Sequence, residues 1–147
     1  MTTQALPADA GLASELRLAV MRLRRRLAVE RHPDNELSIN QMGVLGVLNR
    51  RGEMTLGELA AAEKVQPPSM TRTVNCLVES GDVVKRPHDS DGRQIVVTLS
   101  EQGRSRVAAD RVRRDAWLAR RLDELSPEDR DVLHRAAVLL DHLAQKD

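Results

Sequence analysis

The sequence of 147 residues contains no Phe and no Tyr, and Trp117 is its only aromatic residue. A core without these side chains must be built from Leu, Val, Ala and Met. Such a core suits packed helices better than a β-sandwich, in which β-branched and aromatic residues dominate. The length fits one compact domain, or a small module with additional helices. These features together favour a mostly helical fold.

Cysteine and long apolar segments are equally scarce. Cys76 is the only cysteine, which excludes an intrachain disulfide and a zinc site built from several cysteines, and suits a reducing compartment. The first apolar stretch is interrupted by Glu15 and Arg17. We therefore expect neither a secretory segment nor a membrane span, and we expect the protein to act in the cytoplasm.

An excess of charge of one sign is also missing. The chain carries 23 Lys and Arg against 22 Asp and Glu, a formal net charge of +1. A strongly basic balance would be a direct indication of nucleic-acid binding. Here any contact with DNA must come from the local placement of Arg and Lys.

Long amphipathic helices are predicted at both ends of the chain. Leu and Val recur at helical spacing over residues 12–27, opposite an Arg-rich face, and Pro33 is expected to end this helix. Ser100 and Ser126 are predicted to open the last two helices. The segment between, residues 38–100, is too small to cover all these apolar faces. We therefore expect the terminal helices to pack on one another and on a twofold copy of the chain.

The central segment carries the signals of a helix-turn-helix. Capping boxes at S-I-N-Q, from Ser38, and T-L-G-E, from Thr55, are predicted to open two helices. A third is predicted over residues 66–80, with two prolines in its first turn and Gly81 after its end. The residues of this helix that are expected to face the core are Met70, Val74, Leu77 and Val78.

A change of period after Gly81 predicts a β-hairpin. Residues 83–86 and 95–99 read as two strands, Pro87 ends or edges the first, and Asp91-Gly92 forms the turn. The expected fold is mostly α with a small β-hairpin wing, a winged helix-turn-helix. In this arrangement the second helix of the pair enters the major groove of DNA, and the wing reaches the adjacent backbone or minor groove.

Side chains suited to DNA lie on the predicted outer face of helix 66–80 and on the hairpin. Arg72 can read guanine with two hydrogen bonds, and Arg93 at the hairpin tip suits a narrow minor groove, with Asp91 orienting its guanidinium. The alternatives are a solvated polar helix face and an exposed ion pair of little energetic value. The predicted DNA-binding set is Ser69, Thr71, Arg72, Asn75, Lys85, Arg86, Asp91 and Arg93.

The ordered motifs between residues 38 and 103 resemble those of the MarR (multiple antibiotic resistance) regulators. They are L-G-E-L-A from Leu56, P-S-M-T-R from Pro68, K-R-P from Lys85, D-G-R from Asp91 and L-S-E-Q-G from Leu99. Two positions depart from the family pattern: Cys76 stands where a basic residue is frequent, and Asp82 where an apolar or aromatic one is usual.

This resemblance implies a dimeric winged-helix regulator of triangular shape. Residues 1–37 would form an N-terminal tail and dimerisation helix, residues 38–100 the DNA-binding lobe, and residues 101–147 the C-terminal dimerisation helices. The hypothesis is a sequence-specific regulator that binds double-stranded DNA at a pseudo-palindromic operator as a homodimer. It would repress transcription, and a bound ligand would relieve this repression.

The sequence says less about what controls the binding of DNA. The resemblance implies a small phenolic or anionic effector in a cleft between the dimer helices and the lobe, and Arg24, Met42 and Trp117 are candidates to line it. Oxidation of Cys76 on the DNA-facing side of its helix is an alternative. The ligand-binding residues remain open at this point.

Other functional classes have little support in the sequence. We find no Gly-rich phosphate loop and no Ser/His/Asp arrangement of an enzyme, and predict no cofactor. His134 and His142 are two helical turns apart, too far for one metal, and His32 with Asp34 and Glu36 is expected to be solvated. A winged-helix module that binds only proteins stays open, because residues 38–100 carry seven Lys and Arg and seven Asp and Glu.

Overall fold

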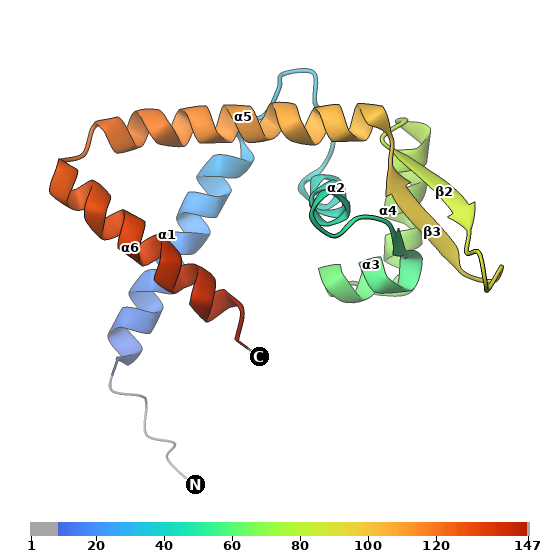
Figure 1. Cartoon of the computed structure of the whole chain (residues 1–147), viewed down its shortest axis with the longest axis horizontal. Helices are drawn as coiled ribbons and strands as arrows, with labels where there is room; N and C mark the ends of the chain where they lie inside the picture. Colours follow the sequence, from blue (N-terminus) through green and yellow to red (C-terminus); the bar gives the residue numbers. More distant parts are fainter. Residues whose placement is uncertain (1–8, 147) are drawn as a thin grey trace, which may run out of the picture.

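The computed structural model of the protein describes residues 9–146, so most of the predicted N-terminal tail lies outside the described residues. It contains helices and a small antiparallel sheet, in the order expected from the sequence except for an additional short strand, β1 (Figure 1). The elements are α1 (Ala10–Ala28), α2 (Ile39–Arg51), β1 (Met54–Thr55), α3 (Leu56–Glu63), α4 (Pro67–Glu79), β2 (Val83–Pro87), β3 (Ile95–Leu99), α5 (Glu101–Asp123) and α6 (Pro127–Ala144).

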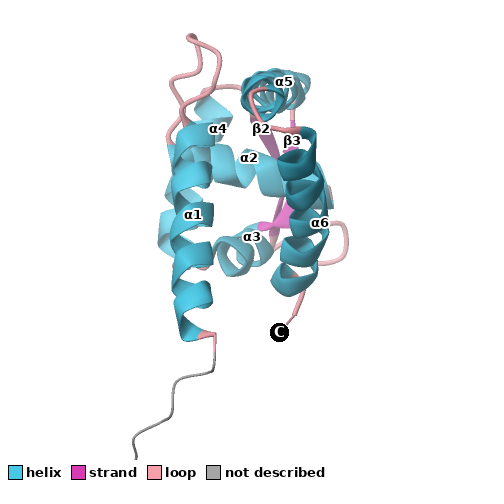
Figure 2. Ribbon diagram, turned by 90° about the vertical axis from the view of Figure 1, so that its left-hand side faces the viewer, coloured by secondary structure: helices cyan, strands magenta, loops and turns pink. Residues whose placement is uncertain are grey.

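The helix α5 spans the molecule and separates two groups of elements. Figure 1 shows α2, α3, α4 and the sheet at one end of α5, and α1 and α6 at the other. In the perpendicular view of Figure 2, α1 and α6 lie apart on opposite sides of the molecule, so the expectation that the terminal helices pack closely on one another within the chain is not met. The lobe formed by α2–α4 and the sheet is therefore joined to the remaining helices only through α5 and the α1–α2 loop.

Side-chain caps start most of the helices where the sequence predicts them. The Ser38 hydroxyl accepts a hydrogen bond from the Gln41 N–H (3.1 Å), and the Gln41 amide oxygen accepts one from the Ser38 N–H (2.8 Å). Thr55 and Glu58 form the second capping box in the same way. Each cap satisfies N–H groups that have no partner within the first turn of a helix.

The end of α1 differs from the prediction that Pro33 terminates it. The helix ends at Ala28, and residues 29–38 form a loop held by long-range contacts. The His32 N–H donates to the Asp110 carboxylate of α5 (3.1 Å), and the Arg31 guanidinium donates to the Leu37 carbonyl. These contacts draw the chain away from the helical path before the proline is reached.

The sheet has three strands in the order β1-β3-β2, rather than the two of the predicted hairpin. β1 pairs Met54 with Val97, and β2 pairs Val83 with Leu99 and Pro87 with Ile95. Two residues are too short a strand to leave a periodic signal in the sequence. β2 is an edge strand, where a proline without an N–H is tolerated.

The core lies within the lobe, and α4 is fixed on it by one face. Met70, Val74 and Leu77 are buried in the core cluster, where α4 packs on α2, α3 and β2. The prediction that Val78 faces the core is wrong, since its side chain is 37% exposed. Neither α1 nor α6 contributes a residue to this core. None of the helices within residues 9–146 has the length and apolar character needed to cross a membrane.

Candidate nucleic-acid interface

The polar face of α4 lies on the outside of the lobe. Burial of Met70, Val74 and Leu77 leaves Ser69, Thr71, Arg72, Asn75 and Cys76 exposed, as the helical spacing predicts. The Thr71 hydroxyl donates to the Pro67 carbonyl (3.1 Å), which leaves its lone pairs available. Arg72 has no ion-pair partner among residues 9–146. This helix thus presents a guanidinium without an ion-pair partner on an outer face that can enter the major groove of DNA.

The start of α4 is suited to a phosphate group. Its first two residues are prolines, which lack N–H groups, and Gln66 makes no side-chain cap. Ser69 therefore carries the first N–H of the helix, at the positive end of the helix dipole. Helix N-termini of this kind commonly contact the DNA backbone and fix the register of the protein on the duplex.

A hydrogen bond connects the wing to α4. The Lys85 ammonium group on β2 donates to the Asn75 side-chain oxygen (2.7 Å), and both residues are exposed. The structure thus brings together two of the predicted site residues from different elements. The contact fixes the wing beside the outer face of α4.

Arg86 is held by two acidic partners. Its guanidinium lies 2.8 Å from the Glu53 carboxylate, before β1, and 3.2 Å from the Asp89 carboxylate at the wing tip. The hydrogen bond and the charge of Glu53, with a contribution from Asp89, raise the pKa of Arg86 above its ordinary value. Arg86 therefore stays charged at any physiological pH, and its charge is locally balanced.

The wing tip is organised by Asp91 in a different way from the one predicted. The Asp91 carboxylate accepts a hydrogen bond from the backbone N–H of Arg93 (3.1 Å), whereas no ion pair between the two side chains is formed. Short Asp side chains commonly bond to the backbone two residues on, and this stabilises turns. The exposed Arg93 guanidinium also lacks an acidic partner within the described range.

Asp82, the unusual residue between α4 and β2, is completely buried and is the centre of a polar network. Its carboxylate accepts hydrogen bonds from Arg106 Nε (2.8 Å) of α5 and from the Ser80 hydroxyl (2.6 Å). Arg106 also donates to Asn35 in the α1–α2 loop (3.3 Å), and Asn35 donates to the buried Asp110 (2.7 Å). No periodic pattern predicts the pairs of this network that join α5 to Asp82 and to the α1–α2 loop, because their members lie 24 to 75 residues apart.

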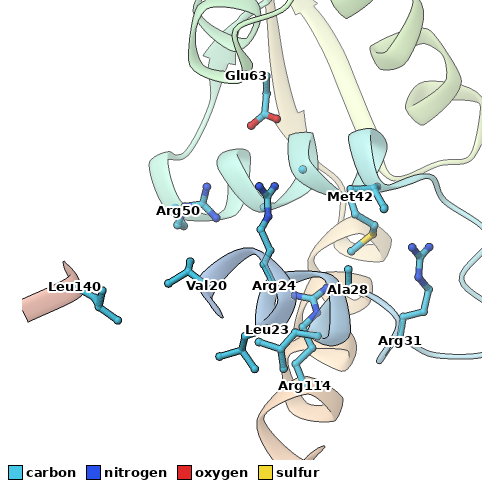
Figure 3. A pocket seen from close by; sticks show the side chains of 14 residues that line it. Val20, Leu23, Arg24, Ala28, Arg31, Met42, Arg50, Glu63, Arg114 and Leu140 are labelled. Carbon is cyan, nitrogen blue, oxygen red and sulfur yellow. The ribbon is translucent and has the colours of Figure 1, made fainter. Parts of the chain in front are cut away.

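A cleft of about 570 Å³ lies between α1 and the lobe (Figure 3). Arg24 points from α1 across the cleft toward Glu63 of α3, and Met42 lines the side formed by α2. Its lining combines apolar side chains with four arginines and one glutamate, namely Arg24, Arg31, Arg50, Arg114 and Glu63. Trp117, the third candidate from the sequence, does not line it. Its ring lies instead 4.4 Å from the Arg26 guanidinium.

Two other candidates from the sequence stay without a site in the structure. Within residues 9–146, no group of three or more His, Cys, Asp or Glu side chains is placed to hold a metal ion. Cys76 is an exposed free thiol on α4. The prediction that its oxidation controls DNA binding stays a prediction.

Known proteins are similar to this chain in both sequence and fold. The MarR family pattern matches residues 37–95. A helix-turn-helix-type transcriptional regulator of Mycobacterium tuberculosis is 47% identical over 135 residues, which cover 92% of this chain and 94% of the relative. A Pseudomonas aeruginosa protein assigned as a transcriptional regulator has a TM-score of 0.83 at 33% identity, covering 97% of this chain and 100% of its own. A Streptococcus pneumoniae protein, crystallised in complex with DNA, has a TM-score of 0.71 at 16% identity, covering 91% of this chain and 97% of its own.

A helix-turn-helix whose second helix is exposed beside a β-wing defines a winged-helix DNA-binding protein. Within that class, the MarR pattern over residues 37–95, together with the identity to a helix-turn-helix-type regulator over 92% of the chain, shows that the chain belongs to the MarR family. It is a DNA-binding transcriptional regulator of that family. The regulator class, the family and the winged-helix fold expected from the sequence are thereby confirmed, and the relatives are regulators rather than enzymes.

Proposed function

We propose that the protein binds a pseudo-palindromic operator as a homodimer, with α4 as the recognition helix in the major groove and the β2–β3 wing at the minor groove. The observation that carries this proposal is the pair of unneutralised guanidinium groups, Arg72 on α4 and Arg93 on the wing. Ser69, Thr71 and Asn75 add polar contacts on α4, and Lys85 adds a positive charge on the wing. Arg86 and Asp91 shape the wing through their local bonds.

The uncovered apolar faces of α1 and α6 support a dimer. Along α1 these faces include Leu12, Leu16, Val20 and Leu23, and along α6 they include Leu133, Leu140 and Leu143, each between 37% and 57% exposed. Soluble monomers rarely expose large contiguous apolar patches. A twofold copy of the same helices would cover both faces, because a C2 interface is self-complementary. It would also place two recognition helices on successive turns of DNA.

We further propose that the dimer represses transcription. A small phenolic or anionic ligand, bound in the cleft between α1 and the lobe, relieves this repression. The support is the lining of this cleft: four arginines surround an apolar surface, which suits an aromatic ring that carries an anionic group. Because one wall belongs to α1 and the other to the lobe, an occupant would change their relative position. The relatives are bacterial proteins, and bacterial chromosomal DNA lies in the cytoplasm, so we propose that the protein acts there.

The DNA contacts are tested by titrating labelled duplexes, selected by the protein from a random pool, at several salt concentrations. Arg93→Ala should weaken binding to most sequences by a similar factor and lower the salt dependence. Arg72→Ala should in addition relax the preference at one base position, at a cost of about 1–3 kcal/mol. Parent-like titrations for both variants would refute this assignment. Affinity for a protein partner alone, insensitive to salt, would favour the protein-binding module instead.

The ligand site is tested by adding phenolic and aromatic carboxylic acids to the same titration. An active compound should release the operator from the parent protein, and Arg24→Ala should weaken this release about tenfold or more, because a charge-assisted hydrogen bond is lost. Arg22→Ala is the matched control, since Arg22 lies on the same helix but outside the cleft. Equal release from both variants would place the ligand elsewhere.

A further inference from the structure

The lobe and the remaining helices meet at a buried polar network. The chain passes between the two groups only at the α1–α2 loop and at α5. Asn35 lies in that loop, Arg106 and Asp110 lie on α5, and Asp82 lies at the corner between α4 and β2. One set of hydrogen bonds therefore links both connections to the end of the recognition helix.

The network is balanced in charge, with two carboxylates and two guanidinium groups, although Arg114 Nε is buried without a hydrogen-bond partner among the described residues. The side chains of Asp82 and Asp110 are essentially inaccessible to solvent, and Arg106 and Arg114 lie 2.8 Å and 3.7 Å from them. Asn35 connects the two ion pairs, because its amide oxygen accepts from Arg106 and its amide nitrogen donates to Asp110. Hydrogen bonds to buried charges are directional and costly to break, so they restrict the relative orientation of the elements that carry them.

The backbone at Asp82 is fixed as well. Its N–H donates to the Leu77 carbonyl of α4, and its carbonyl accepts from the Ser100 N–H at the start of α5 (both 3.0 Å). A Cβ atom at Gly103 would lie 2.1 Å from the Asp82 carbonyl oxygen, so only glycine allows this approach of α5. The corner that ends α4 is thus held against the first turn of α5 by backbone and side chain together.

We propose that Asp82, Arg106 and Asn35 are positioning residues that set the angle between the recognition helix and the dimer helices, and thereby the half-site spacing that the protein accepts. This inference rests on the proposed dimeric binding to two half-sites. In a twofold dimer the separation of the two α4 helices follows from the angle of each lobe to α5. A rigid angle therefore selects one half-site spacing, close to a turn of DNA, and a flexible angle accepts several.

The test uses the operator selected by the full-length protein, with the half-sites moved apart or together by about one or two base pairs. The variant Asp82→Leu/Arg106→Met replaces the buried ion pair by apolar groups, a change that often preserves stability. Asn35→Ala keeps both ion pairs but removes the bridge between them, together with the hydrogen bonds of Asn35 to the Leu37 N–H and the Met42 sulfur. Arg111→Met is the control, because it makes the same type of change at an exposed position of α5.

The parent and Arg111→Met should lose about tenfold or more in affinity at the altered spacings, as expected for a rigid two-site protein. The double variant, and Asn35→Ala to a smaller degree, should lose less than about threefold, while their affinity for a duplex with a single half-site stays at the parent value. A sharp spacing preference retained in a folded Asn35→Ala would overturn the inference, as would an equal loss on single half-sites in both variants. If the parent itself shows no spacing preference, the proposed dimeric binding fails instead.

Discussion

Two arginines of the wing, seven residues apart in sequence, have opposite electrostatic surroundings. Arg86 faces Glu53 and Asp89, whereas Arg93 has no acidic partner among residues 9–146 and the carboxylate of Asp91 is engaged with the backbone. A guanidinium that is already paired with carboxylates neutralises DNA phosphates poorly, so its contact displaces few counterions from the DNA. We therefore expect these residues to differ in how salt affects their contribution.

Arg93→Ala should lower the slope of log affinity against log salt concentration by about 1.8, which is about 0.9 for the phosphate contact of each protomer of the proposed dimer. Arg86→Ala should leave this slope unchanged but weaken binding, because the wing loses its tie to the residues before β1. Fluorescence anisotropy with one operator over a range of KCl concentrations measures both quantities. A reduced slope for Arg86→Ala would make Arg86 a phosphate contact, as the sequence alone predicts.

At the scale of the elements, the sequence predicted what depends on local physics. Helix starts follow from side chains that bond within one turn, so Ser38, Thr55, Ser100 and Ser126 are all caps in the structure. The exposed face of α4 followed from helical spacing, and the wing followed from its turn residues. Each of these signals lies within a few residues of the element it determines.

The features that the sequence did not predict depend on distant partners. β1 exists because Met54 and Thr55 pair with β3, more than 40 residues later. The ion pair of Arg86 needs Glu53, which lies 33 residues away. The network around Asp82 needs side chains from α5 and the α1–α2 loop. A departure from the family pattern marked Asp82 as unusual, but no pattern indicated its partners.

At the scale of the molecule, the single chain leaves its apolar surface unevenly covered. All of the buried hydrophobic core lies in the lobe and the start of α5, while α1 and α6 have no buried residue. α6 follows α5 after a short turn, at the end of α5 that lies away from the sheet (Figure 1), and packs on no other element of the described chain as closely as the elements of the lobe pack on one another. Exposed apolar faces of this extent support the proposed dimer, in which a twofold copy of the chain would cover these helices.

A charge placed on the apolar face of α6 should therefore dissociate the dimer, whereas the same charge on the polar face should not. Leu133→Glu adds a carboxylate to the stripe that includes Leu140 and Leu143, and burying it without a partner is costly. Arg135→Glu adds it on the opposite side of the helix. By light scattering, the mass of Leu133→Glu should fall from twice 16.4 kDa to 16.4 kDa, with affinity for the operator reduced to that for one half-site. Arg135→Glu should keep the mass and operator affinity of the parent. A Leu133→Glu protein that remains dimeric would show that α6 lies outside the dimer interface, and α1 alone would then have to supply it.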